Sequence, residues 1–398
     1  MHAEIFALGS ELTTGAKLDT NSQWLSVELA GAGIETRFHH TVADDLPAML
    51  SELRAASRRS ELVLLTGGLG PTADDLTRES LAQLAGVPLV EDAASLAHVQ
   101  ECYRRFGRTM PAANRVQALI PAGAEVIPNR HGTAPGLWMT VPPGEIGGDG
   151  GCTLIALPGV PAEMRPMFRE SVLPRLPRGA NLIRVARMNL FGAGESAVEE
   201  RLGDLTARGR TPEVGITAHE ATITLRIVAR APDEAGVQRQ FEETKRIAVE
   251  RAEELIFGEE DETLAGCVLN LLRERGETLA IAEVGTGGRL ADWLTQEDVP
   301  DARAFLGGLV EPTETICLGA AVAPGEAASE VRSRWGATYG LFTPALDESG
   351  AERAIVLATP DREVRATYRH AIDSAIARSR LAKAALDLLR RHLLGRAT

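Results

Sequence analysis

The chain has 398 residues, of which 44% are hydrophobic and 24% are charged. This ordinary globular composition excludes a disordered chain, a collagen-like chain and a small disulfide-stabilised scaffold. At roughly 150 residues per domain, the length indicates two or three domains. The formal net charge of −13 disfavours non-specific binding to nucleic acid or anionic membrane, although a local site could still bind a phosphorylated small molecule.

The four cysteines lie far apart and form no CxxC pair. They predict neither a zinc site nor a disulfide framework, but buried or free thiols in a reducing compartment. The N-terminal segment has no basic region followed by a long apolar stretch, and no run approaches the roughly 20 apolar residues of a membrane span. We therefore expect a cytoplasmic protein.

The first part of the chain alternates predicted strands and helices. The apolar run Glu61–Thr66 is typical of a strand buried on both faces. Thr20 and Asn21 are expected to cap the first helix, and the glycine-rich segment 142–151 is expected to be a surface loop between two strands. This alternation predicts an α/β domain with a doubly wound, mostly parallel sheet, in which ligands bind beyond the carboxyl ends of the strands. The expected strands are 4–8, 34–41, 61–66, 137–141 and 153–157, and the expected helices are 20–31, 46–56 and 76–85.

Two further units follow, so that the predicted domains are 1–175, 180–259 and 260–398. The middle unit is a small α+β module with strands near 182–190 and 213–229 and helices at 195–205 and 237–255. It has no GXXG loop or basic groove, which favours a scaffold role over nucleic-acid binding. The last unit is a second α/β domain. We expect a helix at 264–274, a strand at 278–283, a glycine turn at 285–288 leading into a helix, and a long helix from about 362 to 394.

The most informative segment is the glycine-rich loop Thr66–Thr77, which follows a buried strand and opens a helix. Its glycines allow positive φ and close approach of a ligand, and its amides can form an anion site for a phosphate or pyrophosphate. Asp74 and Asp75 would repel that anion unless a divalent metal lay between them. The alternative is that one of these aspartates only caps the helix.

Acidic residues also follow the first two predicted strands. Glu11 comes after the first strand, and Asp44 and Asp45 come after the second. Each alone could be a cap or a solvated turn. Because strand ends of a doubly wound sheet can meet at one crevice, their shared position supports a common site with the glycine loop.

These motifs resemble the competence/damage-inducible protein CinA family, whose first domain is similar to the molybdopterin-binding domains of the MoaB/MogA type. The middle unit is placed where that family has a KH-like module, and the last where it has its C-terminal domain. The matching segments are Gly9–Gly15, Asp19–Asn21, Thr41–Asp45, Gly67–Thr77, Asn129 with Gly132–Gly136, and Leu157–Met164.

The resemblance implies that the first domain hydrolyses ADP-ribose, in a metal-dependent reaction, to AMP and ribose 5-phosphate. It implies a divalent ion (magnesium, cobalt or manganese), with a monovalent cation as a further cofactor. Asp44 and Asp75 would hold the metal with Glu11, and Asp74 would lie nearby as a further catalytic carboxylate. A small nucleotide is the expected partner, and a homodimer the expected assembly. The implied substrate contacts are Gly9, Asn21 and the loop residues Gly67, Gly68, Leu69, Gly70, Pro71 and Thr72.

The last domain departs from the family pattern. The family's C-terminal domain deamidates nicotinamide mononucleotide with a serine in a Glu-Ser-Cys-Thr-Gly-Gly segment, but Val284 occupies that position here. Pro312 and Cys317 replace the expected tyrosine and lysine. A valine cannot act as a nucleophile, and Cys317 lacks an obvious activating base, so a structural thiol is expected there.

Three functions compete at this point. The first is a metal-dependent nucleotide pyrophosphatase with a catalytically silent C-terminal domain. The second is a pterin- or nucleotide-binding protein without hydrolytic turnover, which could use the same loop. The third, an active amidohydrolase, ranks last because its catalytic positions are changed.

Overall fold

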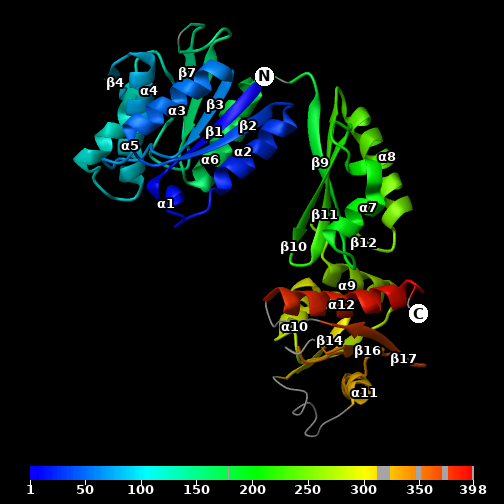
Figure 1. The fold of residues 1–398 in the computed structure, drawn as a ribbon. Helices are drawn as coiled ribbons and strands as arrows, with labels where there is room; N and C mark the ends of the chain where they lie inside the picture. The colour runs from blue at the N-terminus through cyan, green and yellow to red at the C-terminus, as the bar shows by residue number, and fades with distance from the viewer. Residues whose placement is uncertain (145, 178, 312–322, 347–350, 370–374, 397–398) are drawn as a thin grey trace. The chain divides into compact units, whose positions relative to one another are not determined.

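The computed structural model describes residues 1–144, 146–177, 179–311, 323–346, 351–369 and 375–396 (Figure 1). They form two compact units. The first comprises residues 1–184 and 230–237, and the second comprises residues 185–229 and 238–398. Among the described residues, no helix is both long and apolar enough to cross a membrane.

A six-stranded sheet with the order β2-β1-β3-β8-β7-β6 lies at the centre of the first unit. Four strands are parallel: β1 (His2–Leu8), β2 (Glu35–Val42), β3 (Leu62–Thr66) and β8 (Cys152–Leu157). At one edge β7 (Gly136–Val141) and β6 (Glu125–Ile127) add antiparallel strands. The predicted doubly wound, mostly parallel sheet is confirmed.

Each face of this sheet buries its own hydrophobic cluster. Because side chains alternate along a strand, Phe6 and Leu8 of β1 point to one face and Ile5 to the other. Helices α3 (Leu46–Arg59) and α4 (Thr77–Ala85) cover the first face. Helices α2 (Thr20–Gly31) and α6 (Pro161–Met167) cover the second. The strands β1 and β3 are therefore held on both sides, which fixes the position of the loops that follow them.

Several local details of the first unit differ from expectation or were not predicted. Asp19, and not Thr20 or Asn21, caps α2, because its carboxylate accepts a hydrogen bond from the Ser22 amide at 3.0 Å. The expected glycine-rich loop does connect β7 to β8. Elements that the sequence did not reveal include β6 and α6, together with α1 (Ser10–Thr13), β4 (Leu89–Glu91), α5 (Ala93–Arg105), the 3₁₀ helix Ala112–Ala118, and β5 (Leu119–Pro121).

The second unit begins with a four-stranded sheet with the order β10-β11-β9-β12. The hairpin of β10 (Glu213–His219) and β11 (Thr222–Ala231) turns at Glu220 and Ala221, which both have positive φ. β10 lies within, and β11 begins within, the segment 213–229, where the sequence predicts strands. The remaining elements are β9 (Leu182–Leu190), α7 (Glu195–Leu202), α8 (Glu234–Ala252) and β12 (Ile256–Glu259).

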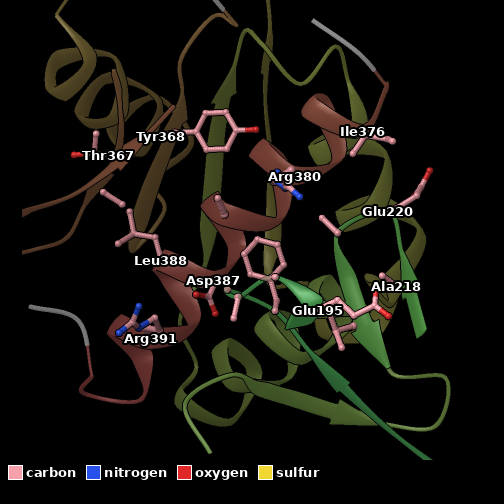
Figure 2. A pocket seen from close by; sticks show the side chains of 18 of the residues that line it. Glu195, Ala218, Glu220, Thr367, Tyr368, Ile376, Arg380, Asp387, Leu388 and Arg391 are labelled. Atoms are coloured by element: carbon pink, nitrogen blue, oxygen red, sulfur yellow. The ribbon is translucent and has the colours of Figure 1, made fainter. Parts of the chain in front are cut away.

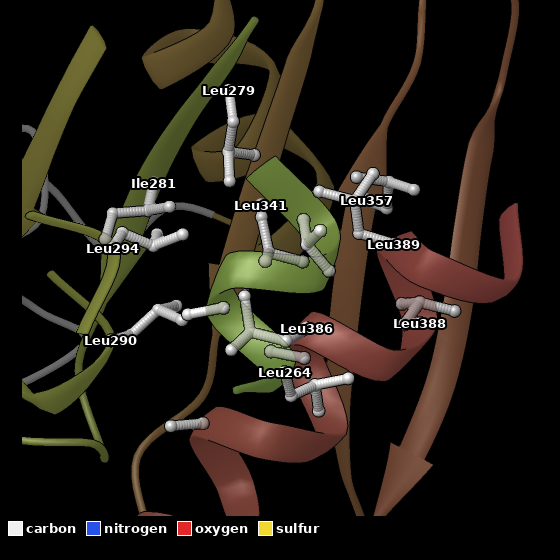
Figure 3. Close-up of a cluster of buried hydrophobic side chains, with 14 of the residues drawn as sticks. Leu264, Leu279, Ile281, Leu290, Leu294, Leu341, Leu357, Leu386, Leu388 and Leu389 are labelled. Atoms are coloured by element: carbon white, nitrogen blue, oxygen red, sulfur yellow. The ribbon is translucent and has the colours of Figure 1, made fainter. Parts of the chain in front are cut away.

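The second unit continues with a five-stranded sheet, β14-β13-β15-β16-β17. Leucines of α9 (Leu264–Arg275), α10 (Arg289–Glu297) and α12 (Ala375–Leu393) pack on one face of this sheet, as Figure 3 shows. A smaller cluster that includes α11 (Pro324–Trp335) covers the other face. The strands are β13 (Leu279–Glu283), β14 (Phe305–Val310), β15 (Tyr339–Thr343), β16 (Arg353–Ala358) and β17 (Glu363–Tyr368).

The predicted long helix from 362 to 394 is wrong in its first part. Residues Glu363–Tyr368 form β17, which pairs antiparallel with β16, and α12 is described from Ala375 onward. Val364, Ala366 and Tyr368 are less exposed than Arg365 and Thr367 between them, and this alternation has the period of a strand. The turn before β17 is closed by the Thr359 hydroxyl, which accepts hydrogen bonds from the amides of Asp361 and Arg362.

Candidate functional site

The carboxyl ends of four parallel strands meet around one cavity in the first unit. β1 lies between β2 and β3, so the chain passes from β1 to β2 on one side of β1 and then crosses back to form β3 on its other side. Such a switch point opens a crevice beyond the strand ends. The loops stay joined there: the Gly9 amide donates to Val42 O and the Gly67 amide to Leu157 O, each at 3.0 Å. The cavity has a volume of about 630 Å³.

Nearly all the residues predicted for the site line this cavity. They are Gly9, Glu11, Asn21, Asp44, Gly67, Gly68, Leu69, Gly70, Pro71, Asp74 and Asp75. Thr72 does not line it, and instead donates hydrogen bonds from its amide and hydroxyl to Asp75.

The backbone of the glycine loop turns its carbonyl groups toward the start of α4. Gly67 O and Gly68 O accept hydrogen bonds from the hydroxyl and amide of Thr77. Leu69 O and Gly70 O accept from the guanidinium of Arg78 at 2.8 and 2.6 Å. In a planar trans peptide the next N–H points away from the carbonyl, so the N–H groups of Gly68 and Leu69 face away from α4. Within the described residues these two N–H groups have no acceptor.

This geometry requires glycine at the start of the loop. Gly67 has φ 105° and Gly68 has φ 64°, a region that side chains disfavour. A Cβ atom on Gly67 would lie 2.4 Å from Leu8 O, and one on Gly68 would lie 2.3 Å from the Thr77 hydroxyl. Successive amides in such a loop form a concave anion site.

Asp75 holds the loop closed. Its Oδ1 accepts from the Gly70 amide at 2.8 Å, and its Oδ2 accepts from the amide and hydroxyl of Thr72. The residue that precedes α4 is Leu76, and no side chain caps that helix. The alternative that Asp74 or Asp75 is only a helix cap is therefore wrong. Because a carboxylate has about four lone-pair sites, Asp75 keeps capacity for one more partner.

The structure separates the two adjacent aspartates after β2. Asp44 lies on the cavity, where its Oδ2 accepts from the Ser10 amide at 2.8 Å and its own amide donates to the Ser10 hydroxyl. Asp45 caps α3 by accepting from the Ala48 amide at 2.8 Å. Of the two, Asp44 therefore lines the candidate site, and Asp45 caps a helix.

The cavity is strongly acidic. Six carboxylates and one lysine line it, and Lys17 Nζ lies 3.4 Å from Glu11 Oε1. A bare pyrophosphate would be repelled by these charges. The six carboxylates that line the cavity are those of Glu11, Asp19, Asp44, Asp74, Asp75 and Glu163.

Glu11, Asp44 and Asp75 share the cavity but do not form a ready-made metal cage. In the part of the chain that the structure describes, no three or more His, Cys, Asp or Glu side chains are grouped to hold a metal ion. Magnesium, however, is usually bound by one or two carboxylates together with substrate phosphates. Asp44, which has one engaged oxygen, and Asp75 fit that mode of binding.

Asn21 positions the site. Its Nδ2 donates to the Thr66 hydroxyl at 2.9 Å and to Gly159 O at 2.8 Å, which ties the ends of β3 and β8 together. Its amide nitrogen is thus occupied, and the residue shapes the cavity wall.

Several lining residues were not singled out as site residues from the sequence. Glu163 accepts a hydrogen bond from Asn129 Nδ2 at 2.7 Å, and Asn129 in turn holds the segment that brings Thr133 to the cavity. Glu163 and Thr133 lie in two segments, Leu157–Met164 and Gly132–Gly136, that match the family pattern, and this match could have identified them from the sequence. Lys17 and Gln117 had no sequence signal that distinguished them from surface residues.

A larger cavity, of about 790 Å³, lies in the second unit between the β10–β11 turn, β17 and α12. Figure 2 shows Arg380, Asp387 and Arg391 along α12 at this cavity. Among its described lining residues are three arginines and three carboxylates, whose formal charges balance, and no glycine loop followed by paired acids. The cavity of the first unit is therefore the better candidate site.

The altered positions of the C-terminal domain support a structural role. Val284 is buried in a hydrophobic cluster with 6% exposure. Glu283 is fully buried, and it accepts hydrogen bonds from the Thr286 hydroxyl and from the Leu290 and Ala291 amides at the start of α10. Pro312 and Cys317 lie outside the described residues.

The three cysteines in the described ranges are free, as expected. Burial raises the pKa of the thiols of Cys102 and Cys267, and raises the pKa of Cys152 to about 12. These thiols are protonated at neutral pH and are poor nucleophiles.

Fold and site together define a molybdopterin-binding-type α/β domain followed by a KH-type module. Residues 4–178 match the family described as "Probable molybdopterin binding domain", and residues 186–258 match "Damage-inducible protein CinA KH domain". A CinA-like protein of Frankia casuarinae is 38% identical over 99% of this chain and 97% of its own length. One of Thermomicrobium roseum is 36% identical over the same shares. The chain belongs to the CinA-like protein family.

Solved structures show related domains. The CinA protein of Thermoplasma acidophilum is 32% identical, covers 42% of this chain and 95% of its own, and has a TM-score of 0.38. The MoaB protein of Thermus thermophilus is 26% identical, covers 44% of this chain and 91% of its own, and has a TM-score of 0.29.

Proposed function

We propose that the first domain hydrolyses the pyrophosphate bond of ADP-ribose, or of a related nucleotide, to AMP and ribose 5-phosphate. The observation that carries this proposal is a pair of N–H groups, of Gly68 and Leu69, that have no acceptor among the described residues and line the same cavity as Asp44 and Asp75. Amides without acceptors favour phosphate oxygens, and adjacent carboxylates favour a cation bridging to those oxygens.

Different residues of the site would bind the phosphate oxygens and the cation. The N–H groups of Gly68 and Leu69 receive phosphate oxygens, and Asp75 and Thr77 keep the loop in shape. Asp44 and Asp75 would hold the divalent cation, with Glu11 nearby. That cation would neutralise charge on the phosphoryl oxygens and increase the acidity of a bound water. The oxygen of one water forms a bond to one phosphorus, the bond from that phosphorus to the bridging oxygen breaks, and that oxygen leaves with the other phosphate. The proton that the water loses passes to the solvent.

The pyrophosphate of the proposed nucleotide and the lining of the cavity are both negatively charged. We therefore expect the cation to enter together with the substrate. A metal that neutralises part of the pyrophosphate charge removes the repulsion from six carboxylates. We therefore propose magnesium, manganese or cobalt as the metal, with a monovalent cation as a possible addition, in a homodimeric protein of the cytoplasm.

Incubation of the purified full chain with ADP-ribose and each divalent metal tests this proposal. The expected result is AMP and ribose 5-phosphate in equal amounts, with no product in the presence of a chelator. ADP-ribose that stays intact with all three metals would contradict it.

A pterin- or nucleotide-binding function without turnover is the second candidate. It is favoured by the family match of residues 4–178 and by the lack of a three-carboxylate cage among the described side chains. Saturable binding of ADP-ribose or of a pterin without any AMP production would support this candidate instead.

A further inference from the structure

Arg78 is a charged residue buried directly behind the glycine loop. Its side chain is 1% exposed, and its guanidinium donates to Leu69 O and Gly70 O. Its Nε has no partner, and within the described residues it forms no ion pair. The nearest acidic groups that influence it are Glu79 and Asp75, while burial lowers its pKa.

A second buried arginine shows how such a charge is usually accommodated. Arg390 is 2% exposed, and it forms an ion pair with Asp387 at 2.7 Å in addition to its bonds to two carbonyl groups. Burying a charge without a counterion is costly. No ion pair balances the charge of Arg78 among the described residues, and the two peptides that it holds directly follow the Gly68 and Leu69 N–H groups in the loop.

We propose that Arg78 is the positioning residue of this loop: it holds two carbonyl groups away from the cavity and supplies the positive charge that a bound pyrophosphate balances. This rests on the proposed function, because it assumes that the loop binds a pyrophosphate. Two adjacent carbonyls at 2.6 and 2.8 Å match the fork of one guanidinium. The Leu69–Gly70 peptide plane is thereby fixed with its own N–H on Asp75. It directly follows the Gly68–Leu69 peptide, whose carbonyl accepts from the Thr77 amide and whose N–H faces away from α4. The site consequently selects for the dense negative charge of a pyrophosphate over an uncharged nucleoside.

Binding of magnesium pyrophosphate by the full chain, measured by calorimetry, tests this role. Arg78→Met removes both the charge and the fork, and the dissociation constant should rise at least about tenfold. Arg78→Lys keeps the charge but cannot satisfy both carbonyls, so a smaller rise of roughly threefold is expected. In turnover of ADP-ribose, both variants should raise KM.

Arg390→Met is the matched control, since it removes a buried arginine from the second unit. It should lower the melting temperature and leave the affinity for pyrophosphate unchanged. A merely structural role for Arg78 predicts the same pattern as this control. Wild-type affinity in Arg78→Met would overturn the proposal, and if that variant does not fold, wild-type affinity in Arg78→Lys would overturn it.

The same measurements separate the two proposals. If the wild-type chain binds pyrophosphate but forms no AMP, hydrolysis is wrong and the role of Arg78 is still decided by its variants. If the wild-type chain does not bind pyrophosphate at all, both proposals fail.

Discussion

At the residue scale, two adjacent aspartates have separate tasks. Asp44 faces the cavity with one oxygen engaged by Ser10, whereas Asp45 caps α3. Asp44→Ala should lower the rate of AMP formation at least about a hundredfold, because the loss of a metal ligand would remove several kcal/mol of transition-state stabilisation. Asp45→Ala should retain turnover and lose about 1 kcal/mol of stability with its cap. Steady-state rates and thermal melts of both variants test this, and equal loss of activity in the two would contradict the assignment.

Asp75 should serve both catalysis and loop stability. Its three accepted hydrogen bonds contribute about 1.5–4.5 kcal/mol in total, since each is worth roughly 0.5–1.5 kcal/mol. Asp75→Ala should therefore abolish AMP formation and also lower the melting temperature. Thr72→Val, which removes only the hydroxyl donor, should lower stability less and keep measurable turnover. Turnover by Asp75→Ala at the wild-type rate, with saturating metal, would refute its role in the site.

Glu4 links the stability of the first unit to pH. Burial raises its pKa, but hydrogen bonds from Arg59, Ser60 and His40 outweigh burial, and the pKa is lowered overall. A lowered pKa in the folded state stabilises the protein above the ordinary value of 4.5, and that contribution disappears as the pH falls through the folded-state pKa.

Glu4→Gln should consequently lower the melting temperature at pH 7 by the equivalent of about 1–3 kcal/mol. The difference from wild type should shrink as the pH falls below 4.5. Thermal melts of both proteins from pH 3 to 8 measure this. A difference that stays constant across that range would show that the Glu4 carboxylate is not the responsible group.

At the scale of elements, the sequence predicted those parts that depend on local pattern. The alternation of apolar runs with amphipathic helices placed β1, β3 and α3 correctly, and the motif Gly67–Thr77 placed the loop at a strand end. The sequence could not reveal Arg78, because its neighbours Leu69 and Gly70 approach only after the loop folds back on α4. β17 was missed because the strong helical pattern of α12 obscured the weaker alternation just before it.

The strand assignment of β17 can be tested by two substitutions. In a helix Val364 and Thr367 would lie on one face, but in a strand they lie on opposite faces. Val364 is buried in the cluster of α9, α10 and α12, and Thr367 is exposed. Val364→Ala should cost about 2 kcal/mol of unfolding free energy. Thr367→Ala should change it by less than about 0.5 kcal/mol. Denaturant titrations that find the two substitutions equally costly would contradict the strand.

At the scale of the whole molecule, the candidate site lies in the first unit, whereas the last domain is notable for its large hydrophobic core. The first unit contains a cavity with unpartnered amides and six carboxylates. The last domain has a large leucine-rich core, yet its segment 283–288 is built for packing, because Glu283 caps α10 and Val284 is buried. A fold can thus be retained after a site has changed, since core packing and site chemistry depend on different residues.

We therefore predict that the full chain does not release ammonia from nicotinamide mononucleotide. Acyl transfer needs a side chain that can become a nucleophile and a group that activates it, and Val284 provides neither. Val284→Ser should not restore the reaction by itself, because the hydroxyl would enter a hydrophobic cluster without an activating base. The substitution should instead lower stability by about 1–3 kcal/mol, the cost of burying a hydroxyl without a partner. Ammonia release at an enzymatic rate by the wild-type chain would show that another nucleophile acts in this domain, and the prediction of a catalytically silent domain would fail.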